Sequence, residues 1–175
     1  AVRDYLRSLK PRIKANCEPG HYYLVNNYNP GYFGDGTKAY GDKNASNYVF
    51  TIPPSDLRMI GEELIENDVS WGYFGDMWNN YLGDKYQTGA GYAYCNICNW
   101  AQYSTAIMTN PSARKQHLRD TADLYAGIAS GDLPAVSYVK PSGLVDGHPA
   151  SSKLNLYEGF VAKIVQGVQA NPKLW

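Results

Sequence analysis

Short β-rich apolar runs alternate along this chain with stretches whose apolar residues recur at helical spacing. The first pattern predicts buried strands, and the second predicts helices that bury one face. Strands are predicted at 20–25, 69–74 and 135–139, and helices near 1–9, from Pro53, from Asn110, from Asp120 and from about Asn155. This alternation of helix and strand predicts an α/β fold.

Three of the predicted helices have clear start signals. The segment 53–55 precedes a face made of Leu57, Ile60, Leu64 and Ile65. Asn110 stands before Pro111, and proline is favoured at the first helical position. Asp120 is a suitable N-cap for the next helix, which is expected to end at Gly131.

The last predicted helix has the widest apolar stripe. Asn155 and Glu158 stand at the spacing of a capping box. The stripe comprises Leu156, Tyr157, Phe160, Val161, Ile164, Val165 and Val168. A stripe of this width predicts a helix that covers a sheet. Few strands are visible, and the chain stops at 171–175, where a further strand is expected, so the pattern predicts a truncated α/β domain.

Length and composition predict one domain over 1–175. The 175 residues, of which 44% are apolar, are enough for one packed core. A loop rich in Tyr, Gly and Asn is expected as an insertion at about 26–50, and loops of this length are usually functional or disordered. Gly31, Gly34 and Gly36 do not form a phosphate-cradling motif, because no Lys-Ser/Thr pair follows them. We expect them in a surface loop.

The charge balance excludes some partners. Sixteen basic and sixteen acidic residues cancel, and no run of Lys or Arg occurs. Without a basic patch, the chain is not expected to bind nucleic acid or an anionic membrane surface. No apolar stretch approaches the roughly 20 residues needed to cross a bilayer, so no transmembrane segment is expected. The amino terminus has no signal-peptide pattern.

Three cysteines, Cys17, Cys95 and Cys98, leave one over if two of them pair. In an oxidising compartment we expect one disulfide, either between Cys95 and Cys98 or between Cys17 and one of them. A zinc site needs further ligands that do not stand at the required spacing. A redox dithiol normally begins a helix after a strand, whereas this pair lies in an aromatic loop. The pattern favours a structural role.

His148 is the best chemical candidate in the chain. It lies in a polar loop after the strand predicted at 135–139, where ligands bind in open α/β sheets. An imidazole there could donate to a non-bridging oxygen or protonate a leaving group. The alternative is a turn histidine that bonds only to backbone, because Asp-Gly-His-Pro at 146–149 is also ordinary turn chemistry.

Other candidates are weaker. His21 is expected to serve a turn, and His117 is expected on a solvated helix face beside Arg114, Lys115 and Arg119. No Gly-x-Ser-x-Gly motif is present, so no Ser-His-Asp triad can be assigned. Carboxylates are scattered and no cluster of Asp or Glu stands beside a histidine to hold a divalent ion. From its residues alone, the chain lacks a complete catalytic constellation.

Several segments together resemble one known family. They are 17–36, 60–64 with 69–71, Tyr-Cys-Asn-Ile-Cys-Asn at 94–99, and 133–139 with Asp-Gly-His-Pro at 146–149. They are similar to the middle of bacterial phosphoesterases, the family of phospholipase C and the respiratory-burst-inhibiting acid phosphatase, within the alkaline phosphatase-like superfamily. The resemblance covers nearly the whole chain. It implies part of an alkaline phosphatase-like αβα sandwich, truncated at both ends.

The resemblance also implies a function. It implies a hydrolase of phosphate esters that uses a Ser or Thr nucleophile beside a divalent metal ion, and export from the cytoplasm to the periplasm or medium. Residue by residue, His148 matches a family position that contacts phosphoryl oxygens or assists the leaving group. Asp146 and Lys140 lie nearby and are candidate substrate-binding residues. No residue of this chain is assigned to the metal.

The chain also departs from the family pattern. The Glu-Asn metal motif, the nucleophile segment, and the Asp-Glu-Gly-Gly and Asp-His motifs are absent. Ile97-Cys98 stands where many relatives have a His-His pair. We therefore expect a central fragment that binds no metal and hydrolyses no phosphate ester on its own, since phosphoryl transfer depends on positioning and charge neutralisation. Exposed sheet edges in such a fragment favour self-association.

Two other functions stay open from the sequence. A non-catalytic module could bind carbohydrate or a protein through the aromatic-rich loop. A thiol-disulfide protein would use Cys95 as its reactive thiolate. Neither has a motif comparable to the phosphoesterase match.

Overall fold

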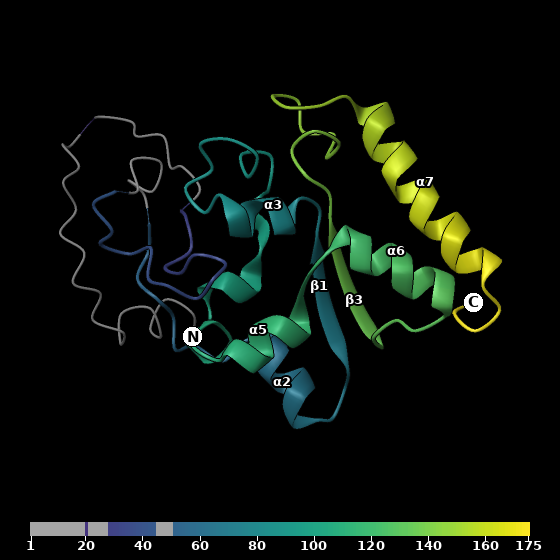
Figure 1. Cartoon of the computed structure of the whole chain (residues 1–175), viewed down its shortest axis with the longest axis horizontal. Helices are drawn as coiled ribbons and strands as arrows, with labels where there is room; N and C mark the ends of the chain where they lie inside the picture. Colours follow the sequence, from purple (N-terminus) through teal and green to yellow (C-terminus); the bar gives the residue numbers. More distant parts are fainter. Residues whose placement is uncertain (1–19, 21–27, 45–50) are drawn as a thin grey trace.

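The computed structural model describes residue 20 and residues 28–44 and 51–175 (Figure 1). The helix predicted near 1–9, the strand predicted at 20–25 and the turn role of His21 fall outside these residues, as does Cys17. The described part folds around one small parallel sheet, with helices on both of its faces.

The sheet has three parallel strands in the order β2-β1-β3. Strand β1 (Trp71–Gly75) is central, and Tyr73 pairs with Leu118 of β2 (Leu118–Asp120) and with Tyr138 of β3 (Val136–Lys140). The strands predicted at 69–74 and 135–139 are thus confirmed to within two residues. Strand β2 was not predicted, because its three residues stand directly between two helices.

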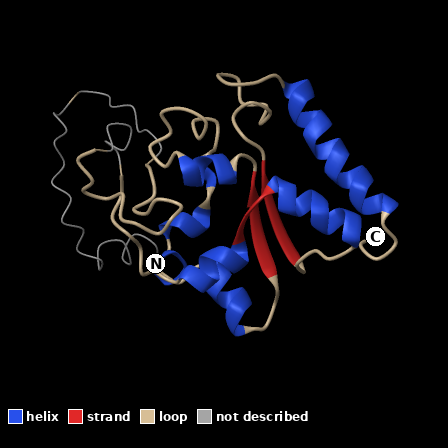
Figure 2. Ribbon diagram, viewed as in Figure 1, coloured by secondary structure: helices blue, strands red, loops and turns tan. Residues whose placement is uncertain are grey.

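Alternate residues of β1 serve the two faces of the sheet. Trp71 and Tyr73 belong to a large aromatic core cluster, whereas Phe74 packs with Leu124 and Ile128 of a helix on the opposite face. Helices α6 (Thr121–Ser130) and α7 (Leu154–Ala170) contribute to the cluster around Phe74, and both lie on the same side of the sheet in Figure 2. The α/β class is confirmed, while the extent of an alkaline phosphatase-like sandwich and the truncation stay predictions.

Two of the predicted helix starts are confirmed. Asn110 caps α5 (Pro111–His117), and its side chain accepts from two backbone N–H groups of the first turn. Asp120 caps α6 and forms a capping box with Asp123. Helix α6 ends at Gly131, whose positive φ of 72° suits glycine.

The helix predicted from Pro53 begins later than expected. Helix α2 spans Ile60–Glu66, because Ser55 is held in a bridge beside Ser104 by backbone hydrogen bonds to Tyr103 and Thr105. The predicted apolar face is also wrong: Leu57, Ile60 and Ile65 are exposed, and only Leu64 packs against the core. The contact face instead uses Gly61, which lets the helix approach Trp71 and Trp100.

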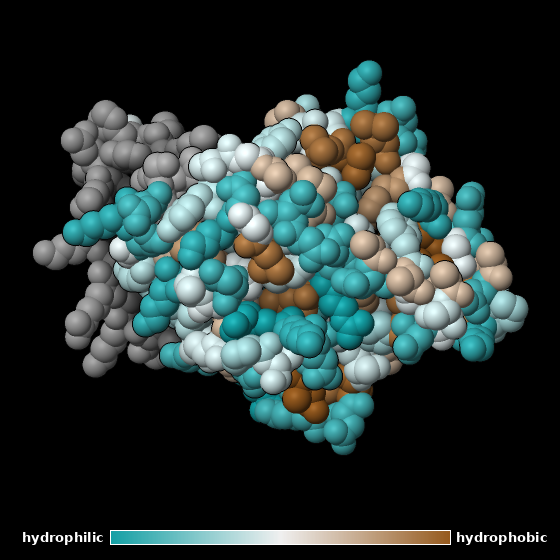
Figure 3. Space-filling model, viewed as in Figure 1, coloured by the Kyte–Doolittle hydropathy of each residue, from teal (hydrophilic) through white to brown (hydrophobic). Residues whose placement is uncertain are grey.

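Helix α7 begins at Leu154, and the predicted capping box of Asn155 and Glu158 is wrong, because Lys153 is the N-cap and gives no side-chain cap. Ile164 and Val168 pack against the cluster that contains Phe74. Phe160 is half-buried and the other members of the stripe are exposed, and Figure 3 shows apolar atoms gathered where α7 begins. The exposed members are Leu156, Tyr157, Val161 and Val165, and Leu154 at the start of the helix is exposed as well.

The segment between β1 and β2 fills the other face of the sheet with short helices. They are α3 (Trp78–Gly83), η2 (Asn96–Cys98), η3 (Trp100–Tyr103) and α4 (Thr105–Met108). Aromatic contacts hold this layer together, and Tyr81 stacks on Tyr94 with ring centroids 4.7 Å apart. The expectation that Cys95 and Cys98 lie in an aromatic loop is confirmed in its main feature.

Part of the aromatic-rich loop packs into the protein instead of lying on its surface. Tyr32 and Phe33 are fully buried, and Gly31 and Gly34 are buried with them, so the expectation of glycines in a surface loop is wrong at these two positions. A Cβ at Gly34 would lie 2.9 Å from ring atoms of Trp78 and Tyr81. Glycine is needed there for close approach, not for solvent exposure.

His117 corrects another expectation. It was expected on a solvated face, but it is only 4% exposed and stacks on Trp71. The reason is that α5 ends at His117 and runs directly into β2, so this residue faces the core while Lys115 faces solvent.

Candidate functional site

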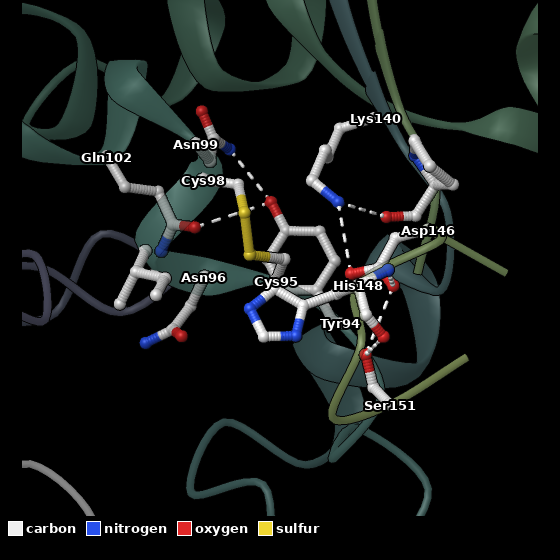
Figure 4. Close-up of a disulfide and its surroundings, with 12 residues drawn as sticks. Tyr94, Cys95, Asn96, Cys98, Asn99, Gln102, Lys140, Asp146, His148 and Ser151 are labelled. Carbon is white, nitrogen blue, oxygen red and sulfur yellow. Dashed lines mark hydrogen bonds and ion pairs between the residues drawn. A yellow bond between two sulfur atoms is a disulfide. The ribbon is translucent and has the colours of Figure 1, made fainter. Parts of the chain in front are cut away.

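The loop after β3 carries the residues that the sequence singled out. Lys140 is the last residue of β3, and Asp146 and His148 follow in the connection to α7. This loop leaves the carboxyl end of the sheet, where parallel α/β sheets place their ligands. Figure 4 shows Lys140 and Asp146 pointing toward one another, with Tyr94 on the neighbouring segment.

Asp146 is the centre of the hydrogen bonds in this loop. Its Oδ1 accepts from the His148 backbone N–H at 2.9 Å and from the hydroxyls of Ser151 and Ser152, each at 3.1 Å. Its Oδ2 lies 3.6 Å from Lys140 Nζ. Burial acts to raise the pKa of Asp146, but these hydrogen bonds and the charge of Lys140 outweigh it and lower the pKa. Asp146 therefore stays charged and fixes the loop.

Lys140 connects the loop back to the strand end. Besides its ion pair with Asp146, its Nζ donates to the Pro141 carbonyl at 3.0 Å. Its side chain is 29% exposed, against 13% for Asp146. The ammonium group is thus held in place at one side and reachable from solvent at the other, which suits a group that meets an anionic ligand.

His148 is brought into the same loop, but its ring does not touch Lys140 or Asp146 through any hydrogen bond in the described structure. The exposed imidazole accepts at Nδ1 from the Ala150 backbone N–H, at 3.2 Å. A backbone N–H can only donate, so the neutral ring carries its proton on Nε2. The turn role is therefore confirmed, and it leaves Nε2–H without a hydrogen-bond partner among the described residues.

A cleft of about 570 Å³ separates this loop from the segment that contains the disulfide. Asp146 and Ser151 line one side, and Cys95 lies on the other. The two walls are joined by a hydrogen bond of 2.8 Å from the Gly143 N–H to the Ala93 carbonyl. No local pattern in the chain indicates that these two segments, about 50 residues apart, share one cleft.

The wall opposite Asp146 contains the disulfide between Cys95 and Cys98, whose Cα atoms are 5.3 Å apart. This is one of the two pairings left open by the sequence, and Cys17 lies outside the described residues. The two sulfurs are bonded to each other, so the pair cross-links this wall of the cleft. The bond fixes the turn of η2 directly beside the cleft.

Buried side-chain hydrogen bonds support the wall from behind. Asn99 donates to the Tyr94 hydroxyl at 2.9 Å, and Gln102 donates to the Tyr81 hydroxyl at 3.2 Å. Asn99 and Gln102 are both fully buried. Buried amides of this kind hold one conformation, because any other would leave polar groups unpaired.

Asp76 is a site-supporting residue that the sequence reading missed. It directly follows the central strand, accepts from the Thr121 hydroxyl at 3.0 Å and from the Ser142 N–H at 3.2 Å, and donates its own N–H to the Lys140 carbonyl at 2.9 Å. One residue therefore bonds to the ends of both neighbouring strands. The available signal was the polar residue at each strand end: Asp76, Asp120 and Lys140.

The divalent metal that the resemblance implies has no fitting ligand set in the part of the chain that the structure describes. No group of three or more His, Cys, Asp or Glu side chains converges there. At the candidate loop, Asp146 is the single carboxylate, its oxygens accept from three donors, and the Lys140 ammonium lies beside it. A cation in this position opposes a metal ion.

Among the described helices, none combines the length and the apolar character required to cross a bilayer. No curated protein matches the chain closely enough to be reported as a relative. One family model does match, and it extends over residues 13–175, which includes every strand and helix described above. A match of this extent establishes that the chain belongs to the Phosphoesterase family.

Proposed function

We propose that this chain forms part of a phosphate ester hydrolase of the phospholipase C and acid phosphatase type, and that the loop 140–152 contacts the phosphoryl group. The observation that carries the proposal is the family match over residues 13–175. Membership of this family implies a phosphate ester as the substrate. The convergence of Lys140, Asp146 and His148 on the carboxyl end of the sheet supports the choice of loop.

Lys140 has the chemistry to neutralise phosphoryl charge. Phosphoryl transfer depends mainly on positioning and on electrostatic stabilisation of the non-bridging oxygens. The Lys140 ammonium is anchored by Asp146 and by the Pro141 carbonyl, so its position does not have to be organised when the substrate arrives. In this proposal Asp146 positions the ammonium group and shapes the loop, and does not contact the substrate as an acid.

His148 has the chemistry of a proton donor. With Nδ1 accepting from Ala150, the neutral ring carries Nε2–H, which is available to donate to a phosphoryl oxygen. A protonated ring can instead deliver a proton to the departing oxygen. The exposed position of the ring leaves both roles sterically open.

The family resemblance also implies a Ser or Thr nucleophile and a divalent metal. We assign neither to a residue of this chain, so the roles of Lys140, Asp146 and His148 do not depend on a metal bound here. Accordingly, we expect this chain alone to show no turnover above background. Export from the cytoplasm is part of the proposal, and the Cys95–Cys98 disulfide supports it, because disulfides persist in oxidising compartments.

The alternative of a binding module that uses the aromatic-rich loop has less support. The aromatic side chains of that loop include Tyr32 and Phe33, which are buried in packing and cannot reach a ligand. Tyr28 and Tyr40 are about half exposed, but neither lines the cleft beside Asp146.

Hydrolysis of 4-nitrophenyl phosphate and of bis(4-nitrophenyl) phosphate tests the proposal. Each is measured with Mg²⁺, Mn²⁺, Ca²⁺ or Zn²⁺, for this chain and for the same chain expressed together with its flanking reading frame. We expect turnover in the extended protein alone, reduced at least about 100-fold by His148→Ala. The ratio of monoester to diester turnover reports the substrate class.

His148→Asn is the matched control, because its side-chain oxygen can still accept from the Ala150 N–H while the ring donor is lost. If the ring is the proton donor, both variants lose activity. Activity retained in His148→Asn and lost in His148→Ala would assign His148 to the turn alone. An extended protein that is inactive toward every phosphate ester and metal tested would refute the proposed function.

A further inference from the structure

A second cleft, of about 680 Å³, lies beside the edge strand β2 and shares no lining residue with the Asp146 cleft. It is bounded by α3, α5, the start of α6 and the turn at Gly34 and Asp35, and Figure 1 shows the positions of α3 and α5. Its volume lies in the range of sites that bind small molecules.

Three cations converge on this cleft. Arg114 and Lys115 come from α5, and Arg119 comes from β2. Within the described residues, none of the three forms an ion pair with a carboxylate. Cations that share a cleft and repel one another, without a carboxylate paired to any of them, favour a bound anion.

The two carboxylates on the cleft wall are already matched elsewhere. Asp35 accepts from the N–H and hydroxyl of Thr37 and pairs with Lys85 at 3.3 Å. Although burial opposes it, this set of bonds lowers the pKa of Asp35. Asp123 accepts from the Asp120 N–H in the first turn of α6, where the helix dipole also favours a negative charge. With Asp35 paired to Lys85, the cleft keeps the three cations against the single carboxylate of Asp123, which leaves it with an excess of positive charge.

The two guanidinium groups are held in fixed positions. Arg114 donates from Nη1 to the Met108 carbonyl, and Gly36 packs against it so closely that a Cβ there would lie only 2.5 Å from Cζ of the guanidinium group. Arg119 donates from Nε to the Gln116 carbonyl at 2.8 Å. These bonds use one donor of each guanidinium and leave the remaining donors for a ligand.

Apolar side chains line the same cleft. Leu82 is 43% exposed, and Trp78 forms part of the wall although it is mostly buried. We propose that this cleft binds a small soluble organic phosphate, with its oxyanion at Arg114, Lys115 and Arg119 and its carbon portion against Leu82. Guanidinium forks suit phosphate oxygens in particular, because they donate two parallel hydrogen bonds.

Titration with phenylphosphonate tests this proposal, since the probe carries a phosphate-like oxyanion and an apolar ring and cannot be hydrolysed by a phosphoesterase. Binding is followed by NMR shifts of the Trp78 indole and of the backbone amides of Asn79 and Arg119. We expect saturable shifts at these groups. Benzyl alcohol, which lacks the anion, should give none.

The variants Lys115→Gln and Arg119→Gln should each weaken binding roughly tenfold, as expected for loss of one charge-assisted contact. Lys43→Gln is the matched control, because it removes one exposed charge outside the cleft and should leave the affinity unchanged. Lys115 makes no hydrogen bond in the described structure, so its variant is expected to fold normally.

Three results would overturn the proposal. They are the absence of saturable shifts in the unmodified chain, equal affinity in the double variant of Lys115 and Arg119, and shifts confined to Gly143, Asp146 and Gly147. The last result would place the anion in the other cleft. This test measures binding alone. A failure of the proposed hydrolase function would therefore leave its result unchanged.

Discussion

The imidazole of His117 lies flat against the indole of Trp71, with ring centroids 4.1 Å apart and planes inclined by 4°. Its Nδ1–H donates to the Trp71 carbonyl at 2.9 Å. Burial lowers the pKa of His117 below its usual 6.5, and the nearby charge of Arg119 adds to this, although the Trp71 hydrogen bond opposes it. The folded protein therefore favours the neutral ring.

This relationship predicts a pH dependence of stability. The unfolded chain binds a proton at His117 near pH 6.5, and the folded chain binds it only at lower pH. Neutral His117 should thus make its full contribution to the free energy of unfolding above about pH 6.5. At lower pH the free energy of unfolding should decrease, by at most about 1.4 kcal/mol per pH unit. Urea denaturation between pH 4.5 and 8 measures this slope.

The variant His117→Phe keeps an aromatic ring against Trp71 and removes the titrating group. Its stability should be lower at pH 8, because the Trp71 carbonyl loses its donor, but the slope between pH 5 and 6.5 should flatten. A slope unchanged by the substitution would assign the pH dependence to other groups.

A second prediction concerns Asp146. Replacing it with Asn removes the charge that pairs with Lys140 and weakens the bonds from Ser151 and Ser152. We expect Asp146→Asn to lower the free energy of unfolding by about 1–2 kcal/mol at pH 7. The exposed Asp132, which makes no side-chain hydrogen bond in the described structure, provides the matched control, and Asp132→Asn should cost under about 0.5 kcal/mol.

The sign of the pH effect at Asp146 follows from its lowered pKa. Its stabilising contribution is present above the usual value of 3.8 and is lost as the pH falls through the lower folded value. The difference in stability between Asp146→Asn and the unmodified chain should therefore shrink in strong acid. A difference that stays constant down to pH 2 would contradict the assigned ionic role.

A third prediction concerns the Cys95–Cys98 disulfide. It closes a very short loop, so chain-entropy arguments give it only about 2 kcal/mol of stability. Reduction should lower the urea midpoint by a corresponding amount, and a Cys95→Ser/Cys98→Ser variant should not respond to reductant. Peptide mapping of the unreduced chain should find Cys17 as the free thiol. A mapped bond that includes Cys17 would show a different pairing.

A fourth prediction uses the bond between Asp76 and Thr121. We expect Asp76→Ala to cost about 2–3 kcal/mol, because Thr121 and the Ser142 N–H lose their acceptor, and Thr121→Val to cost about 1 kcal/mol. The double variant should cost less than the sum, with a coupling of about 1 kcal/mol. Additive effects would mean that the hydroxyl contact contributes nothing to stability.

Much of this fold could be predicted from local signals. Asn110 and Asp120 cap their helices as expected, because an N-cap depends only on residues within one turn. Strands β1 and β3 are apolar enough to be recognised within two residues. Strand β2 could not be predicted, since three residues between two helices form a strand only through pairing with β1.

The candidate site likewise has one part that could be predicted from the sequence and one part that could not. Lys140, Asp146 and His148 are close in sequence, so their shared loop could be expected from the chain. The opposite wall with Cys95 depends on tertiary packing, and so does the burial of His117 against Trp71. The wrong prediction that Ile60 and Ile65 face the core has the same origin. Helical spacing shows which residues share a face, but not which face packs against the rest of the protein.

Asp76 couples the carboxyl ends of the three strands through its hydrogen bonds. Because one carboxylate and its own N–H bridge the β3 end, the β3 loop and the start of α6, a shift in any of these segments is passed to the others. The cleft geometry is therefore a collective property of the sheet's rim. Engineering the substrate preference of the loop 140–152 would therefore require the hydrogen bonds of Asp76 to Thr121 and to the Ser142 N–H to be left intact.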